Sequence, residues 1–94
     1  MSKFEVRKYP VIIDGHNTVH IKIPEGAALL TFRSRLGEPV IYAKVDAKAK
    51  KIVRTFKIIS SCVPINDDPG LVYIGTVEWS SEGWHLFEIV ESSA

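Results

Sequence analysis

Residues 71–90 read LVYIGTVEWSSEGWHLFEIV and contain two strand-like runs on either side of a turn. The runs, 71–79 and 84–90, are rich in β-branched and aromatic residues, which fit a pleated sheet. Ser80-Ser81-Glu82-Gly83 separates them and has the length of a four-residue hairpin loop ending on glycine. This stretch predicts an antiparallel β-hairpin whose aromatic residues Tyr73, Trp79 and Trp84 pack in the core. Trp79 and Trp84 are expected to be cross-strand neighbours.

The N-terminal part of the chain also shows a period of two. Phe4 and Val6 alternate with charged residues, as in a half-buried strand. The run Val11-Ile12-Ile13-Asp14-Gly15 precedes a second alternating segment over residues 17–23. This pattern predicts a hairpin that turns at Asp14-Gly15, because Asp-Gly tolerates the positive φ of tight turns.

Three more strands are predicted between these two regions. Pro24-Glu25-Gly26 favours a chain reversal into a strand through Ala28, Leu30 and Phe32, which ends at Gly37. The other two strands cover 40–45 and 52–59, with Phe56 and Ile58 on one face of the latter and Val53 and Ile59 on the other. The short charged link at 46–51 is expected to be a turn, since six residues are too few for an isolated helix.

Together these signals predict an all-β protein, a small antiparallel β-sandwich or partly open barrel of six to seven strands. Residues 1–94 are expected to form a single domain, because a chain of this length has room for one core. Apolar residues make up 46% of the chain and charged residues 24%, which is the composition of a folded protein.

Cysteine usage and the N-terminus indicate a cytoplasmic protein. The single cysteine, Cys62, has no partner for an internal disulfide, and the first residues lack the apolar stretch of a secretory signal. No apolar run approaches the roughly 18 to 20 residues that cross a bilayer, so no membrane partner is expected.

Charge is distributed unevenly along the chain. Residues 1–57 hold all 12 basic side chains and 5 acidic ones, whereas residues 58–94 hold 6 acidic and no basic side chains. Such asymmetry is typical of an anion-binding face, of a head-to-tail partner surface, or of strands from the two halves that pair their charges across one sheet. We favour the last interpretation. Association with a partner is expected to weaken as salt rises, because exposed charges are screened.

No residue pattern predicts catalysis, a metal site or a cofactor. His16 and His20 would lie roughly 13 Å apart on a strand, too far for one zinc ion. A nucleophile would be Cys62 or a serine beside His85 and an orienting carboxylate of the 60–70 segment, but no local motif supports this arrangement. We therefore expect a protein that is not an enzyme.

Two surfaces are candidates for binding. One is the basic region around the 46–51 connection, with two further arginines on a neighbouring strand: Lys48, Lys50, Lys51, Arg54 and Lys57, together with Arg33 and Arg35. The other is the irregular 60–70 segment, with Asn66, Asp67 and Asp68, because long loops often carry function. Nucleic acid is a less favoured partner, because the basic region has few aromatic residues interleaved with it.

Four short motifs occur in an order and spacing that cover most of the chain. The motifs are Ile23-Pro24-Glu25-Gly26-Ala27, Val45-Asp46, Thr55-Phe56-Lys57-Ile58 and Tyr73-Ile74-Gly75-Thr76. In these motifs the chain resembles a family of small uncharacterised β-domain proteins of tailed phages and prophages. The family pattern has a histidine shortly before a proline that corresponds to Pro64, whereas this chain reads Ser60-Ser61-Cys62-Val63 there, so no role of that histidine carries over.

The resemblance implies a phage-type β domain with no activity attached. The expected function is a non-enzymatic binding module that acts on a host component in the host cytoplasm. Two alternatives stay open: an oligomeric sponge for a small anionic ligand such as a nucleotide, and a self-associating structural protein of the phage particle. Phosphate partners in the sponge would be drawn from Arg33, Arg35, Arg54 and Lys57.

Overall fold

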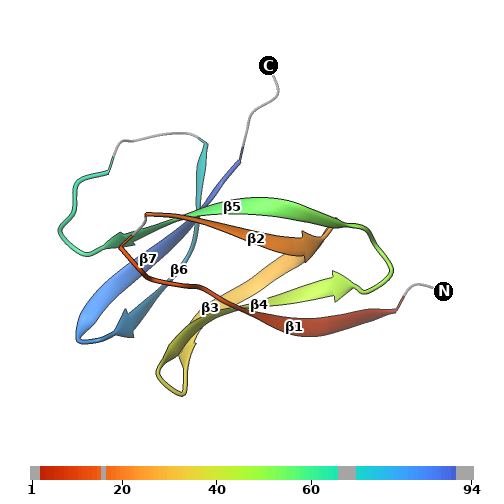
Figure 1. Cartoon of the computed structure of the whole chain (residues 1–94), viewed down its shortest axis with the longest axis horizontal. Coiled ribbons are helices and arrows are strands. Elements are labelled where there is room, and N and C mark those ends of the chain that lie inside the picture. The colour runs from red at the N-terminus through yellow and green to blue at the C-terminus, as the bar shows by residue number, and fades with distance from the viewer. Residues whose placement is uncertain (1–2, 16, 66–69, 91–94) are drawn as a thin grey trace.

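The computed structural model describes residues 3–15, 17–65 and 70–90, and these residues form seven strands in two antiparallel sheets (Figure 1). One sheet has the order β1-β4-β3 and the other has the order β2-β5-β7-β6. The strands are β1 (Phe4–Pro10), β2 (Thr18–Pro24), β3 (Ala28–Arg35), β4 (Glu38–Asp46), β5 (Lys51–Ser60), β6 (Leu71–Trp79) and β7 (Glu82–Ile89). The all-β, sandwich-like class predicted from the sequence is confirmed. In the described part of the chain no helix is long and apolar enough to cross a bilayer.

The core lies between the inner faces of the two sheets. Phe56 and Ile58 of β5 are buried, with at most 1% of their surface exposed, opposite Ile41 and Val45 of β4, which are fully buried. Since side chains alternate between the two faces of a strand, residues two apart along each strand contribute to this core. The prediction that Phe56 and Ile58 share the inner face is therefore confirmed.

Along one side of the sandwich, the edge strands β3 and β6 of the two sheets pack against each other. Gly75 of β6 lies so close to β3 that a Cβ atom placed on it would be 3.1 Å from the Cβ of Phe32. Each of these strands also has an irregular register, between Leu29 and Thr31 in β3 and between Tyr73 and Gly75 in β6. Such bulges bend a strand, which lets the two edges meet without closing the structure into a barrel.

The predicted hairpin at Asp14-Gly15 is wrong. β1 pairs with β4 and β2 pairs with β5, so the chain crosses from one sheet to the other between them. Val11 of this connection is 3% exposed and belongs to the core, while Gly15 has a φ of 94°. Of the apolar run before Asp14, Val11 thus packs between the sheets and Ile13 is partly buried against the core, whereas Ile12 is 65% exposed. Asp14-Gly15 lies in the connection that crosses between the sheets.

The hairpin of β6 and β7 is confirmed, but its loop has two residues instead of four. Ser80 and Ser81 have φ values of 54° and 65°, and Trp79 pairs directly with Glu82. Trp84 pairs with Val77, so the two tryptophans are diagonal neighbours whose ring centroids lie 6.4 Å apart. Two consecutive positive φ values define a type I′ turn, whose twist matches that of the flanking strands.

Three large side chains expected in the core lie at the surface. Phe4, Val6 and Tyr73 are each more than half exposed. Phe4 and Val6 point away from the sandwich, because their partners Asp46 and Lys44 alternate with the buried Val45 of β4. Alternation predicts that a strand has two different faces, but it does not predict which face another layer will cover.

Candidate functional site

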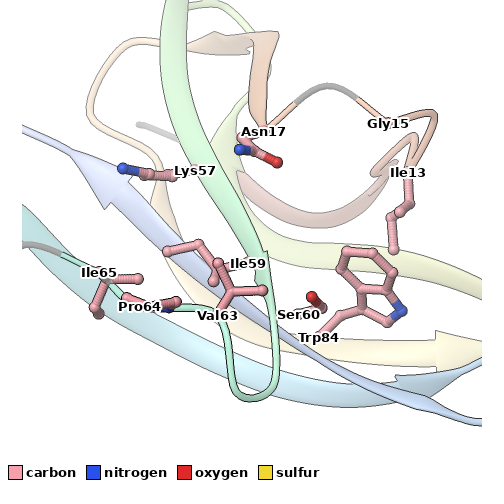
Figure 2. A pocket seen from close by; sticks show the side chains of 10 residues that line it. All are labelled: Ile13, Gly15, Asn17, Lys57, Ile59, Ser60, Val63, Pro64, Ile65 and Trp84. Atoms are coloured by element: carbon pink, nitrogen blue, oxygen red, sulfur yellow. The ribbon is translucent and has the colours of Figure 1, made fainter.

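A pocket of about 260 Å³ lies at the C-terminal end of β5 (Figure 2). It is formed by the β1–β2 connection, the last residues of β5, the first part of the β5–β6 loop and Trp84 of β7. The pocket exists because β5 extends past the start of β2, its antiparallel neighbour. Pairing of these strands begins at Thr18 opposite Lys57, and the Ile58 amide donates to the Asn17 carbonyl at 2.8 Å. β5 continues to Ser60 beyond these contacts.

The walls of this pocket are largely apolar. Trp84 and Ile13 face each other at one end, and both are partly buried against the core. Ile59, which is 5% exposed, lies between them and the loop residues Val63 and Ile65. Concave apolar surfaces with a few polar groups are typical of binding sites in proteins.

Three polar residues line the same pocket: Asn17, Lys57 and Ser60. Figure 2 shows Lys57 at the end opposite Trp84, above Pro64 and Ile65. Within the described part of the chain, no carboxylate lies within 4.0 Å of the Lys57 amino group. The pocket therefore offers a positive charge beside an apolar wall, and an anionic group bound there would be attracted to it.

The β5–β6 loop is shaped by a residue with an unusual backbone conformation. Cys62 has a φ of 70°, and the Val63 amide donates to the Ser60 carbonyl at 3.4 Å. This turn directs Val63, Pro64 and Ile65 back over the end of β5, where they form the pocket wall. Cys62 itself is exposed and is not among the residues that line the pocket.

A chain of hydrogen-bonding side chains crosses the outer face of the four-stranded sheet next to this loop. Ser61 Oγ lies 3.0 Å from His85 Nε2, and His85 Nδ1 lies 2.9 Å from Thr76 Oγ1. Thr76 Oγ1 in turn contacts the hydroxyl of Tyr73. A serine beside a histidine is the start of a nucleophilic site, but here a threonine occupies the position of the orienting carboxylate. This arrangement links the end of β5 to β7 and β6.

Arg54, one of the predicted binding residues, is engaged inside the sandwich. Its Nε and Nη2 donate to the two carboxylate oxygens of Glu88, each at 2.6 Å, and its Nη1 donates to the Ala27 carbonyl at 2.7 Å. The interpretation that charges of the two halves pair across one sheet is confirmed at this position, since β5 lies next to β7.

The other predicted residues do not converge on one site. Arg33 and Arg35 are exposed on β3, in the other sheet. Lys48 and Lys50 lie in the β4–β5 connection and Lys51 begins β5, at the opposite end of the molecule from the β5–β6 loop (Figure 1). Asn66, Asp67 and Asp68 lie outside the described residues. The basic connection and the 60–70 segment are therefore separate surfaces, and Lys57 is the one predicted cation that lines the pocket.

Sequence reasoning missed Ile13, Asn17 and Trp84 as pocket residues. The first two were assigned to a hairpin, and Trp84 to the core. The available signal was that the run Val11-Ile12-Ile13 lacks the alternation of a half-buried strand. The described residues contain no group of three or more histidine, cysteine, aspartate or glutamate side chains that could hold a metal ion.

Comparison with known proteins places the chain in a family without assigning an activity to it. Neither a curated protein nor a solved structure matches the chain. A family model described as a domain of unknown function matches residues 2–94. Because this match spans nearly the whole sequence, the chain belongs to the DUF7352 family.

Proposed function

We propose that this protein is a non-enzymatic binding module that holds an apolar side chain of a partner protein, next to a carboxylate, in the pocket at the end of β5. The observation that carries the proposal is that Lys57 lines the same pocket as the apolar residues Ile59, Val63 and Trp84, with Lys57 at the end opposite Trp84. The pocket has a volume of about 260 Å³, which is below the roughly 300 to 1,000 Å³ typical of small-molecule sites. A side chain therefore suits the pocket better than a cofactor.

A phage origin and a host partner are parts of the same proposal. The resemblance of its motifs to those of small tailed-phage proteins supports a phage origin, and a small β domain that acts by binding would occupy a surface of a host protein. The cytoplasm of the infected cell is where this partner would be met. This step rests on resemblance, since a fold alone does not determine function.

Peptide selection tests the pocket directly. A library of random hexapeptides is selected on the immobilised protein, and enriched peptides are sequenced and measured by calorimetry. We expect enrichment of a large apolar residue beside Asp or Glu. Lys57→Glu should reverse the charge preference and lower affinity for the selected peptides at least ten-fold, because like charges then meet in a partly desolvated site.

The matched control is Lys22→Glu, which makes the same charge change at an exposed position of β2 outside the pocket. If Lys22→Glu and Lys57→Glu reduce binding equally, the effect is one of net charge and the pocket is not the site. If instead only Lys57→Glu reduces binding, both proteins are used to capture proteins from host lysate. A protein that binds the wild type but not Lys57→Glu would be the host partner. Capture unaffected by Lys57→Glu would contradict the proposal.

Reaction with a fluorophosphonate, a reagent for activated serines, tests the non-enzymatic character. Ser61 should remain unlabelled, because the hydrogen-bond partner of His85 Nδ1 is the Thr76 hydroxyl and not a carboxylate. Labelling that is lost in both Ser61→Ala and His85→Ala would show that the serine is activated and that the protein is an enzyme.

A further inference from the structure

The outer face of the β1-β4-β3 sheet carries aromatic and aliphatic side chains that no other layer covers. Phe4 is 57% exposed and Val6 is 60% exposed. The strand register places them on the same face as Tyr42, which is partly exposed and pairs with Lys8 of β1 and Thr31 of β3. At about 3.3 Å per residue along a strand, Phe4 and Tyr42 lie roughly 13 Å apart in the strand direction.

Four exposed cations share this face: Lys8, Arg33, Arg35 and Lys44. The Lys44 amino nitrogen lies 4.8 Å from the centroid of the Phe4 ring. Within the described residues, no carboxylate approaches any of the four cations within 4.0 Å. Two carboxylates lie on the face, Glu38 and Asp46 at opposite ends of β4, so the cations are in excess at its centre.

A shallow hollow of about 180 Å³ adds shape to one end of the face. It is lined by three charged residues, Lys8, Arg35 and Glu38, and by the apolar residues Pro10, Leu36 and Val40. Val40 is 5% exposed although it lies on the outer face, since the neighbouring side chains cover it. The hollow therefore combines two cations and one carboxylate with apolar contact area.

We propose that this face binds single-stranded nucleic acid. Bases would stack on the exposed ring of Phe4 and the partly exposed ring of Tyr42, and phosphates would contact Lys8, Arg33 and Lys44. Exposed aromatic rings interleaved with unpaired cations on an open sheet are the features that single-stranded nucleic acids require. A duplex keeps its bases stacked inside and has none to offer these rings. An acidic protein would use the cations but would gain no specific advantage from the aromatic rings.

The interleaving that is poor around the 46–51 connection is thus present on a different surface, which only strand pairing assembles. β1 is separated along the chain from the hairpin of β3 and β4, and each of the three strands contributes one part of the platform. This surface is separate from the pocket at the end of β5, so the inference goes beyond the proposed function.

Fluorescence anisotropy tests the inference on the intact protein. The probes are fluorescein-labelled dT15, rU15 and a 15-base-pair DNA duplex, each titrated at several salt concentrations from about 50 mM. We expect binding of at least one single strand and at least ten-fold weaker binding of the duplex. With three phosphate contacts, the slope of log affinity against log salt should be about −2, since each contact contributes about −0.7 for single strands.

Paired variants assign the binding to this face. Phe4→Ala should weaken single-strand binding about five-fold or more, because base stacking on an aromatic ring is lost. Tyr73→Ala is the matched control, since Tyr73 is equally exposed, at 57%, on the other sheet, and it should have no effect. Lys8→Ala with Lys44→Ala should reduce both affinity and salt slope, whereas Lys22→Ala with Lys51→Ala should reduce them much less. All substituted side chains are exposed, and circular dichroism verifies that each variant is folded.

Two results would overturn the inference. One is the absence of binding to both single strands at about 50 mM salt. The other is binding that Phe4→Ala leaves unchanged and that a poly-glutamate peptide matches, which would identify the face as a site for acidic proteins. Preference for rU15 or dT15 distinguishes RNA from DNA as the ligand, and either preference supports the inference.

Discussion

Arg54 and Glu88 form a two-pronged ion pair between β5 and β7, with both nitrogen–oxygen distances at 2.6 Å. The side chains retain 20% and 13% of their exposure, so water screens the pair only partly. The third arginine contact, to the Ala27 carbonyl, ties the connection between β2 and β3 to the same pair. The ion pair therefore links the neighbouring strands β5 and β7, and through Ala27 it also holds the connection that leads from β2 to β3 in the other sheet.

Loss of one partner should destabilise the protein. We expect Glu88→Gln to lower the free energy of unfolding by about 1.5 to 3 kcal/mol, because charge-assisted hydrogen bonds are lost and the guanidinium stays partly desolvated. Urea denaturation measures the change. The double variant Arg54→Met with Glu88→Leu should recover much of the loss, since apolar residues of similar volume replace both charges. A double variant less stable than Glu88→Gln would contradict this.

Phe56 and Lys57 are adjacent in β5 but face opposite sides. Phe56→Ala should lower the free energy of unfolding by roughly 3 to 5 kcal/mol, because the side chain is fully buried and leaves a cavity. Lys57→Ala should change stability by less than about 0.5 kcal/mol, since its side chain lines the pocket outside the core. Equal shifts of the urea midpoint would mean that the face assignment is wrong.

Gly75 and Gly83 both lie close to a neighbouring side chain, but the neighbours differ. A Cβ on Gly75 would be 3.1 Å from the Cβ of Phe32, which is 4% exposed, so Gly75→Ala should cost about 1 to 3 kcal/mol through overpacking. A Cβ on Gly83 would be 2.7 Å from Ser61 Oγ, which is exposed and can rotate away. Thermal melts should show a much smaller loss for Gly83→Ala. A larger loss for Gly83→Ala would show that the contact of Ser61 with His85 supports the fold.

The β6–β7 turn offers a stabilising change. Ser80 and Ser81 both have positive φ values, which cost free energy in residues with a Cβ atom. Replacing the pair by Asn-Gly should raise the free energy of unfolding by about 1 kcal/mol, because these residues adopt the type I′ conformation more readily. Chemical denaturation of the double variant provides the measurement. The reverse order, Gly-Asn, serves as a control and should stabilise less; unchanged stability in both would argue against the two-residue turn.

Local features of this protein could be predicted from its sequence. The period of two defines the strands, and Ser80 to Gly83 and Gly37 mark two hairpins that the structure contains. Phe56 and Ile58 could be assigned to the core because they are large apolar residues two positions apart, which places them on the same face of the strand. For the candidate site, Lys57 and the 60–70 segment were predicted as separate features, but their association with Ile13 and Trp84 was not.

Only the tertiary structure decided how strands that are distant in the sequence pair with one another. Alternation depends on backbone geometry within one strand, so it identifies faces, whereas pairing depends on contacts between residues distant in the chain. β1 and β2 therefore belong to different sheets despite the Asp14-Gly15 signal, and β5 lies beside β7, which brings Arg54 to Glu88. Strand pairing also places Phe4, Lys8, Arg33 and Lys44 on one uncovered face. The last residues of β5, beyond Lys57, are not paired with β2, and a pocket lies there.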